Sequence, residues 1–163
     1  MSRIYYTTME SPVGTLRLVA EEVGLRMVWF VRGRNEEKPD AEWKEDAAFF
    51  ADVIRQLNAY FAGQLREFEI PLLMLGTEFQ ERVWRALLAI PYGETMSYVE
   101  LAKKIGEPKA VRAVGAANGQ NPIPIIVPCH RVIGSDGSLT GFGGGLENKK
   151  KLLELESRQR RLL

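Results

Sequence analysis

Hydrophobic and polar residues alternate along the first third of the chain, a pattern typical of half-buried β-strands. Three such β-prone stretches lie at residues 3–7, 15–20 and 25–31. Turn-forming sequences at 11–14 and 21–24, each ending in glycine, separate them. We therefore predict an antiparallel three-stranded meander, followed by an exposed polar loop at residues 32–44.

The spacing of the apolar positions changes after this loop. From Asp46 to Ala62, aromatic and aliphatic residues recur every three or four positions, and Gly63 ends the pattern. This spacing predicts an amphipathic helix that could cover one face of the sheet. Residues 1–75 are thus predicted to form one α/β domain, and residues 76–163 a second domain.

Two helix starts in the second half carry the same local signal. Thr77 with Gln80, and Ser97 with Glu100, each match the capping box, in which side chain and backbone groups three residues apart bond reciprocally. The first helix is predicted to stop before Pro91, and the second at about residue 105.

A third helix is predicted from Pro108, which the first turn of a helix tolerates, to about Gly119. With the preceding helix it resembles a helix-turn-helix, although an αα-hairpin packed in a core is an equal alternative. The third helix contains little except Ala, Gly and Val around Arg112. Such a helix offers little bulk to a core but can approach another surface closely, which favours the helix-turn-helix.

The remaining segments are predicted from proline and glycine positions. Residues 121–128 contain three prolines and cannot form an ordinary ladder strand, so we expect a rigid, extended apolar segment leading to Cys129. The Asp136-Gly137 turn between β-prone flanks predicts a hairpin or wing. A closing helix is predicted at residues 147–161.

Composition limits the possible chemistry. With 163 residues, 45% hydrophobic and 26% charged, the chain suits one domain or two small ones. One cysteine and one histidine exclude an internal disulfide and a zinc site of the Cys/His type, so we expect no metal and a reducing compartment. The first residues lack an apolar leader, and no apolar run is long enough to span a bilayer. We therefore expect a soluble, cytoplasmic protein that does not bind membranes.

Charge is divided unevenly between the halves. Residues 1–75 hold 9 Lys and Arg against 12 Asp and Glu, whereas residues 76–163 hold 13 against 9. The second half is therefore the better candidate for binding a polyanion.

The single cysteine, Cys129, is directly followed by the single histidine, His130. A lone cysteine is most often a small buried hydrophobic residue, but imidazole is well suited to accept a thiol proton near neutral pH. Neighbours in an extended chain point apart, so a turn or a bridging water is needed. The carboxylate that orients the imidazole could be Glu147, Glu154 or Glu156, and spacing alone does not choose between them.

The motifs around this pair resemble those of the methylated-DNA–protein-cysteine methyltransferases, also called O6-alkylguanine-DNA alkyltransferases. The resemblance covers residues 77–156, and it rests on five short segments: Asn121-Pro122, 128–132, 141–146, 91–95 with Ser97-Tyr98, and 112–115. It implies a ribonuclease-H-like amino-terminal domain, a winged helix-turn-helix carboxy-terminal domain, and no cofactor.

The resemblance also implies roles for the residues near the thiol. Cys129 would accept the alkyl group from guanine O6, without turnover. His130 would deprotonate the thiol through a water molecule, Glu156 would orient His130, and Asn121 would hold the turn that exposes the thiol.

Further roles implied by the resemblance concern DNA. The protein would act as a monomer on double-stranded DNA containing O6-alkylguanine, and we expect O4-alkylthymine as a possible second substrate. Arg112 would enter the base stack and Tyr98 would help to rotate the damaged base out of it. The resemblance also implies the remaining DNA contacts: Ala110, Ala113 and Gly115 would lie at the minor groove, and Ser135 would be a further DNA-binding residue. Val132, Phe142 and Gly143 would line the base pocket with Tyr98.

Two positions depart from the pattern of the family. Phe142 stands where many members have Tyr, and Gly143 where some have Ser. These departures concern the tolerance for bulky alkyl groups and leave the predicted reaction unchanged. The main alternative is a non-catalytic module that binds alkylated DNA and recruits other repair factors. A cysteine hydrolase is less consistent with a single histidine.

Overall fold

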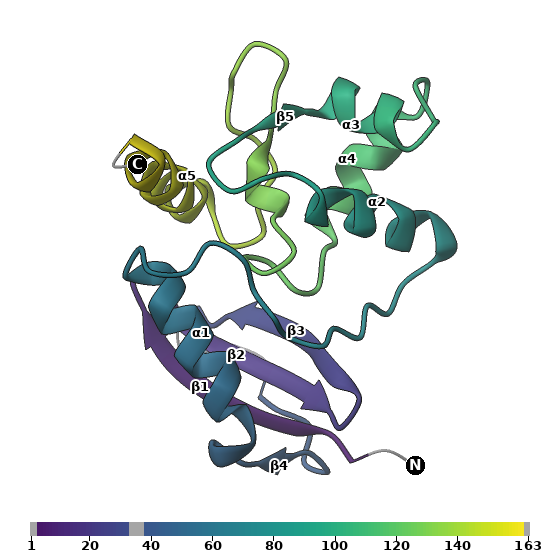
Figure 1. Cartoon of the computed structure of the whole chain (residues 1–163). Coiled ribbons are helices and arrows are strands. Elements are labelled where there is room, and N and C mark those ends of the chain that lie inside the picture. Colours follow the sequence, from purple (N-terminus) through teal and green to yellow (C-terminus); the bar gives the residue numbers. More distant parts are fainter. Residues whose placement is uncertain (1–2, 33–37, 162–163) are drawn as a thin grey trace. The chain divides into compact units, whose positions relative to one another are not determined.

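The computed structural model describes residues 3–32 and 38–161, and it divides the chain into two compact units, residues 1–74 and 75–163 (Figure 1). The first unit is built on a four-stranded sheet of order β3-β2-β1-β4. Its strands are β1 (Tyr5–Ser11), β2 (Gly14–Glu21), β3 (Gly24–Phe30) and β4 (Lys44–Glu45). The antiparallel pairing of β1 with β2 and of β2 with β3 confirms the predicted meander.

The predicted loop at 32–44 is wrong at its end, and residues 33–37 lie outside the described residues. Lys44 begins β4, which pairs with β1 in parallel. A strand of two residues carries no alternation that a sequence can show, and backbone pairing with Tyr5 and Tyr6 alone defines it.

One helix covers a face of this sheet, as predicted, but it starts later than Asp46. A 3₁₀ turn, η1 (Ala48–Phe50), precedes α1 (Ala51–Phe61). The Asp46 carboxylate accepts a hydrogen bond from the Phe49 amide (3.2 Å), so Asp46 caps the turn from outside the helix. The core between sheet and helix is apolar, and its fully buried members include Leu16, Leu18, Phe50, Leu57 and Tyr60.

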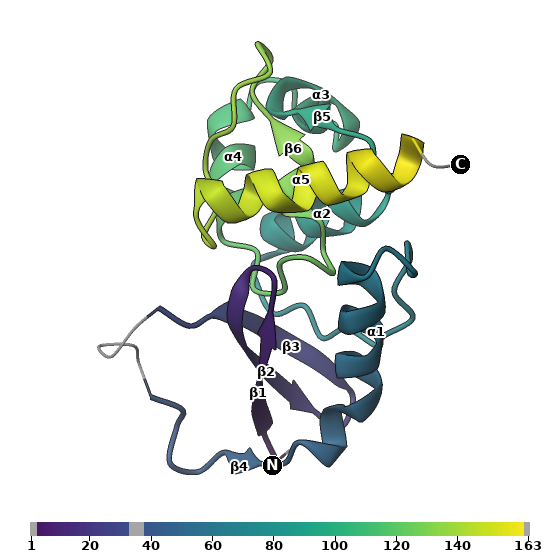
Figure 2. The same cartoon turned by 90° about the vertical axis from the view of Figure 1, so that its left-hand side faces the viewer.

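The described residues of the second unit form four α-helices, α2 (Glu78–Leu88), α3 (Tyr98–Lys104), α4 (Val111–Gly119) and α5 (Leu146–Arg161). Both predicted capping boxes are present. The Thr77 and Ser97 side chains each accept a hydrogen bond from the backbone amide three residues on, and the Gln80 and Glu100 side chains accept one from the Thr77 and Ser97 amides. Figure 2 shows α5, in yellow, lying across this unit.

The third predicted helix begins at Val111 rather than Pro108. The Ala110 amide donates to the Glu107 carbonyl (2.9 Å), so Pro108 lies in a separate turn between α3 and α4. One face of α4 packs against α2 and α3 through Val114 and Ala117. Arg112 and Ala113 are exposed on the other face. The helix thus packs in a core, as in an αα-hairpin, and also exposes a face, as in a helix-turn-helix, so each of the two predicted alternatives is partly correct.

The segment at 121–128 is not extended. The Val127 amide donates to the Ile123 carbonyl (2.9 Å), and Ile125 has a φ of +75°, so the chain folds into a compact turn. Its three prolines exclude a ladder strand, as predicted, but they also suit a turn. Ile123, Ile125 and Val127 are fully buried, and burial of these side chains holds the turn in place.

Of the two forms predicted around Asp136-Gly137, a hairpin or a wing, the structure has the wing. The Gly134 amide donates to Ser138 (2.8 Å) around Asp136-Gly137, so the turn is present. However, the strand before it, β6 (Val132–Ile133), pairs in parallel with β5 (Met96–Ser97), and no strand follows the turn in the described residues. Residues 134–145 thus form a wing-like loop, not a hairpin.

Candidate functional site

Cys129 opens a short 3₁₀ turn, η2 (Cys129–Arg131), placed between the buried turn at 121–128 and β6. The Cys129 amide donates to Val127 (2.8 Å) and the Arg131 amide to Pro128 (3.0 Å), which tightens the backbone here. The Cys129 side chain is buried, with 5% of the residue exposed. Because successive residues of a 3₁₀ turn point in different directions, the thiol and the neighbouring imidazole diverge.

His130 is fully buried and pairs with Glu156 of α5. The His130 Nε2 lies 2.7 Å from Glu156 Oε2. An ionised carboxylate only accepts hydrogen bonds, so Nε2 carries the proton and the Nδ1 of the neutral ring is an acceptor. Nδ1 is buried and has no hydrogen-bond partner in the described residues. The structure therefore selects Glu156 from the three candidates, since Glu147 and Glu154 are both exposed.

Arg131 binds the other side of the same carboxylate. Its Nε donates to Glu156 Oε1 (2.8 Å), its Nη2 to Oε2 (3.1 Å), and its Nη1 to the Ile90 carbonyl (2.7 Å). The Gly93 amide also donates to Oε1 (3.3 Å). Burial alone would raise the pKa of Glu156, but the hydrogen bonds and charges of His130 and Arg131 hold that pKa well below its usual range.

The same surroundings keep His130 neutral. Burial lowers the pKa of His130, and the hydrogen bond to Glu156 only partly opposes this effect. The positive charges of Arg131 and Lys149 lower the pKa further. A neutral imidazole with an unpaired Nδ1 can accept a proton, which is the property required of a general base.

The thiol of Cys129 is protonated in this environment. Burial raises its pKa to about 11, whereas a hydrogen bond from Asn121 and the charge of Lys149 act in the opposite direction. A thiol with this pKa is a weak nucleophile at neutral pH until a base removes its proton. The arrangement therefore requires proton removal coupled to the reaction.

Asn121 holds the turn that precedes the thiol. Its Nδ2 donates to the Val127 carbonyl (2.8 Å), and its Oδ1 accepts from the Ile123 amide (3.0 Å). In α4, the Asn118 Nδ2 approaches the Cys129 carbonyl at 3.4 Å, and its Oδ1 has no partner in the described residues. The helix that carries Arg112 is thereby joined to the backbone of the thiol.

Tyr98, the first residue of α3, lies beside both α4 and the wing loop. Its hydroxyl donates to the Thr140 carbonyl (3.1 Å). A Cβ on Gly115 of α4 would come within 3.7 Å of its ring, and one on Gly141 within 3.4 Å of its hydroxyl. Both distances are ordinary van der Waals contacts, so they place Tyr98 directly against α4 and the wing loop.

The other predicted pocket and DNA residues are spread around Tyr98. Val132 is buried in β6, Phe142 is half-buried, and Gly143 and Ser135 are exposed on the wing loop. Ala110 precedes α4 and is half-buried. The structure thus brings Tyr98, Gly115 and the wing loop together and leaves Arg112, Ala113 and Ser135 at the surface.

Sequence reasoning assigned no role to Arg131 or Lys149. Lys149 is fully buried in α5, and its Nζ donates to the carbonyls of Val132 (2.6 Å) and Thr140 (2.8 Å). Helical spacing places Lys149, Leu152 and Glu156 on one face of α5, so a lysine on the apolar face was a usable signal.

No membrane-spanning helix is present among the described residues, and these residues contain no group of three or more His, Cys, Asp and Glu side chains that could hold a metal ion. The fold and the site together define a class: a two-unit α/β protein whose second unit joins a helix-turn-helix to a buried cysteine, histidine and glutamate.

Comparisons with known proteins identify the family. Residues 4–74 match the ribonuclease-like domain of 6-O-methylguanine DNA methyltransferase, and residues 78–158 match the DNA-binding domain of the same family. The chain therefore belongs to the 6-O-methylguanine DNA methyltransferase family, as its motifs suggested, and its fold is the predicted one.

Individual relatives resemble the chain over nearly its full length. A methylated-DNA–protein-cysteine methyltransferase of Methanosarcina acetivorans is 55% identical, covering 94% of this chain and 98% of the relative. The crystal structure of the Mycobacterium tuberculosis O6-methylguanine methyltransferase has a TM-score of 0.88 at 52% identity, covering 96% and 94% of the two chains. The same M. tuberculosis protein in complex with DNA has a TM-score of 0.87, with coverage of 95% and 94%.

Proposed function

We propose that the protein repairs DNA directly, by moving the alkyl group from O6 of guanine to the sulfur of Cys129. Its relatives are named methylated-DNA–protein-cysteine methyltransferases, and the buried arrangement of Cys129, His130 and Glu156 is the observation that supports this chemistry most. The product is a thioether with no leaving group, so each molecule reacts once.

The proposed reaction starts with the thiol proton. It passes through one water molecule to His130 Nδ1, the acceptor left without a partner by the bond from Nε2 to Glu156. The sulfur electron pair then attacks the alkyl carbon, and the bond between that carbon and guanine O6 breaks with its electrons on the base. The guanine takes up a proton from water as it leaves, and the His130 imidazolium returns its proton to water, so protons balance. No electron donor or acceptor is needed.

Glu156 and Arg131 support this proton transfer without touching the substrate. Glu156 fixes the imidazole tautomer and stabilises the imidazolium that forms, as in other cysteine and serine sites with a third orienting group. Asn121 maintains the turn that presents the sulfur, through its bonds to the turn backbone.

The target base must leave the DNA stack to reach a buried thiol, at a cost of a few kcal/mol. We propose that Arg112 fills the vacated position and that Tyr98 rotates the backbone and contacts the flipped base. The small residues Ala110, Ala113 and Gly115 would let α4 lie close to the minor groove, which carries little sequence information and so suits a search for lesions. Ser135 would contact the backbone from the wing loop.

The pocket for the flipped base is proposed to form beside Tyr98. Backbone groups near Val132 and Gly143 would bind the base edge, with Phe142 at the rim. O4-alkylthymine presents a similar alkyl group and is proposed as a second substrate. We further propose that residues 76–163 hold all of the chemistry, that residues 1–75 have a structural role, and that the protein works as a monomer in the cytoplasm, where its thiol stays reduced.

The direct test is incubation with a duplex containing one O6-methylguanine, followed by mass spectrometry of the protein. We expect an added methyl group on Cys129, at most one per molecule, and restored guanine in the DNA. Cys129→Ala should bind the duplex and leave the lesion intact. Lesion removal by Cys129→Ala, or a methyl group on another residue, would contradict the proposal; binding without any transfer by the unmodified protein would indicate a recruiting module instead.

A further inference from the structure

Lys149 is a buried cation that the proposed reaction does not use. It is 0% exposed, although lysine side chains are almost never fully buried without a partner. Its Nζ donates to the Val132 and Thr140 carbonyls and lies 6.0 Å from the centre of the Tyr98 ring. These contacts satisfy hydrogen-bond donors and leave the charge itself without an anion.

The ion pairs of the described residues confirm this imbalance. Glu156 is shared by His130 and Arg131, and no ion pair involves Lys149. A buried charge without a partner is costly, so a neutral side chain would serve better if the position were only structural. A function that needs the charge explains its presence more simply.

The thiol is the group that can supply the missing anion. Lys149 and Cys129 interact electrostatically: the cation opposes the effect of burial on the pKa of the thiol, and a thiolate would raise the pKa of the ammonium group. The backbone also links them: Cys129 starts the 3₁₀ turn that leads directly into Val132, and the Lys149 ammonium group donates to the Val132 carbonyl. The attachment to two carbonyls fixes the position of the ammonium group.

We propose that Lys149 is a positioning residue that supplies a fixed positive charge to stabilise the Cys129 thiolate as His130 removes its proton. The proposal rests on the proposed function only in taking Cys129 as the alkyl acceptor. Placed in advance, such a charge needs no reorganisation when the anion forms.

Other ionisable groups around the pair act differently. Arg131 is joined to Glu156, and that carboxylate balances its charge, whereas His130, bonded to the same carboxylate, is neutral. The Tyr98 hydroxyl of α3 is committed to the Thr140 carbonyl. Lys149 is thus the cation near the thiol whose charge no described carboxylate neutralises.

The test measures the reactivity of Cys129 toward a small neutral alkylating agent between pH 7 and 9, without DNA. Because the chain has one cysteine, the label reports a single thiol. In Lys149→Gln the amide still donates a hydrogen bond but the charge is lost. Loss of a nearby cation raises the pKa of a thiol by about one unit or more, which lowers the thiolate fraction about tenfold. The thiolate of a thiol with a higher pKa is intrinsically more nucleophilic, which offsets part of this decrease. We therefore expect the labelling rate of Lys149→Gln to be about three to ten times lower than that of wild type.

Two variants give matched controls. Lys149→Arg keeps the charge and should retain more of the rate than Lys149→Gln, whereas Lys150→Gln removes an exposed charge from the next position and should leave the rate unchanged. An equal rate for wild type and a folded Lys149→Gln would overturn the proposal and leave Lys149 as a structural clamp.

A second pair of variants leaves Lys149 intact, in case its replacement prevents folding. Cys129→Asp places a carboxyl group near the sulfur position, which burial destabilises as an anion unless a cation compensates, and Cys129→Asn is its neutral isostere. If Lys149 stabilises an anion there, the two variants should unfold at similar temperatures at pH 7. An Asp variant far less stable than the Asn variant would overturn the proposal. If the labelling rates and unfolding temperatures are as expected but wild type takes no methyl group from DNA, the proposed function is rejected and the role of Lys149 is not.

Discussion

The two units of the chain bury different kinds of side chain. Among the described residues of the first unit, the buried polar groups are the neutral side chains of Thr7 and Gln56. The second unit buries His130, Arg131 and Glu156, together with Lys149. Burial of charge opposes folding unless each group is paired, so the first core serves stability and the second combines stability with chemistry.

The largest effect should come from breaking the buried network of the second unit. Glu156→Gln removes the anion shared by His130 and Arg131, and leaves a buried guanidinium without its partner. We expect a loss of about 3 to 5 kcal/mol in unfolding free energy. The methyl-transfer rate should fall about a hundredfold or more, because His130, the proton acceptor, loses its orienting group. Urea unfolding and single-turnover assays measure the two effects.

Glu154→Gln is the matched control, two residues away and exposed. It should change the unfolding free energy by less than about 0.5 kcal/mol. Similar losses in both variants would mean that charge on α5 in general, and not the buried network, determines activity.

A cavity in the first unit should cost stability alone. Leu57 of α1 is fully buried, and Leu57→Ala is expected to lower the unfolding free energy by about 2 to 5 kcal/mol. The rate at which folded protein accepts a methyl group should stay within about twofold of wild type, since the affected core contains no charged side chain among its described residues. Val23→Ala, at a position 67% exposed, is the control for stability. A rate loss as large as that of Glu156→Gln would show that the chemistry depends on the first core.

A smaller effect concerns pH, and it isolates one residue because the chain has a single histidine. Burial lowers the pKa of His130, so below the unfolded value of about 6.5 the unfolded chain binds a proton that the folded protein does not. Stability contributed by the neutral ring is present above pH 6.5 and is lost as the pH falls below it. From pH 7.5 to 5.5 we expect a loss of about 1 kcal/mol.

Urea unfolding at the two pH values measures this loss, and His130→Asn should remove most of it. Glu156 adds a separate decline at lower pH: its folded pKa is depressed, so its contribution is present above about pH 4.3 and is lost as the pH falls further. A stability that does not change between pH 7.5 and 5.5 would contradict the neutral state assigned to His130.

Local signals allowed most of the framework to be predicted from sequence. Thr77 and Ser97 mark helix starts because a capping box needs only residues three apart, and strand alternation gave the meander of the first unit. The short strand β4 and the compact turn at 121–128 were not predicted, because distant backbone pairing and burial of isoleucines determine them.

The site was predictable in its motif and less so in its geometry. Cys129 and His130 are conspicuous in a chain with one of each, but the choice of Glu156 required knowing which face of α5 is buried. Arg131 carries no local pattern that separates it from a surface cation, and the sequence signal for Lys149 is only its place on the apolar face of α5. Their roles depend on contacts across the fold, with Ile90 for Arg131 and with Thr140 for Lys149.

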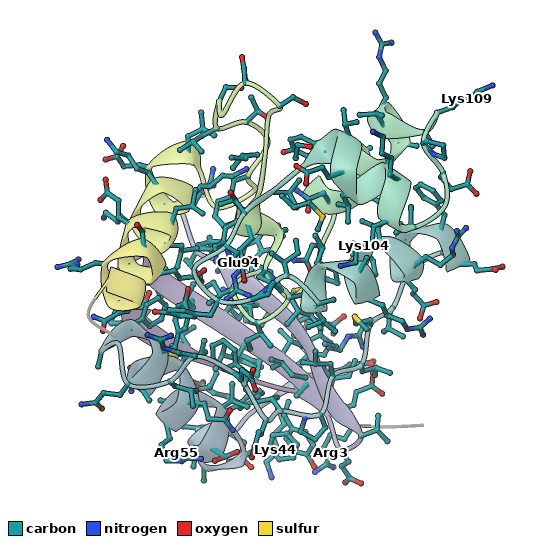
Figure 3. The ribbon with its side chains drawn as sticks, turned by 45° about the horizontal axis from the view of Figure 1, so that its top comes forward. Arg3, Lys44, Arg55, Glu94, Lys104 and Lys109 are labelled. Atoms are coloured by element: carbon teal, nitrogen blue, oxygen red, sulfur yellow. The ribbon has the colours of Figure 1, made fainter. Side chains whose placement is uncertain are left out.

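The smallest predicted effect is on duplex binding, and it is tested by replacing one exposed lysine in each unit. These residues, Lys44 and Lys109, are labelled in Figure 3. Lys109 is exposed in the turn before α4, on the unit that matches the DNA-binding domain, whereas Lys44 lies in β4 of the ribonuclease-like unit. If Lys109 contacts phosphate, Lys109→Ala should weaken duplex binding about threefold at moderate salt. It should also reduce the salt dependence of the binding constant by about one counterion. Lys44→Ala removes the same charge from the protein, so equal weakening by the two variants would mean that net charge, and not a DNA-facing surface on the second unit, controls binding.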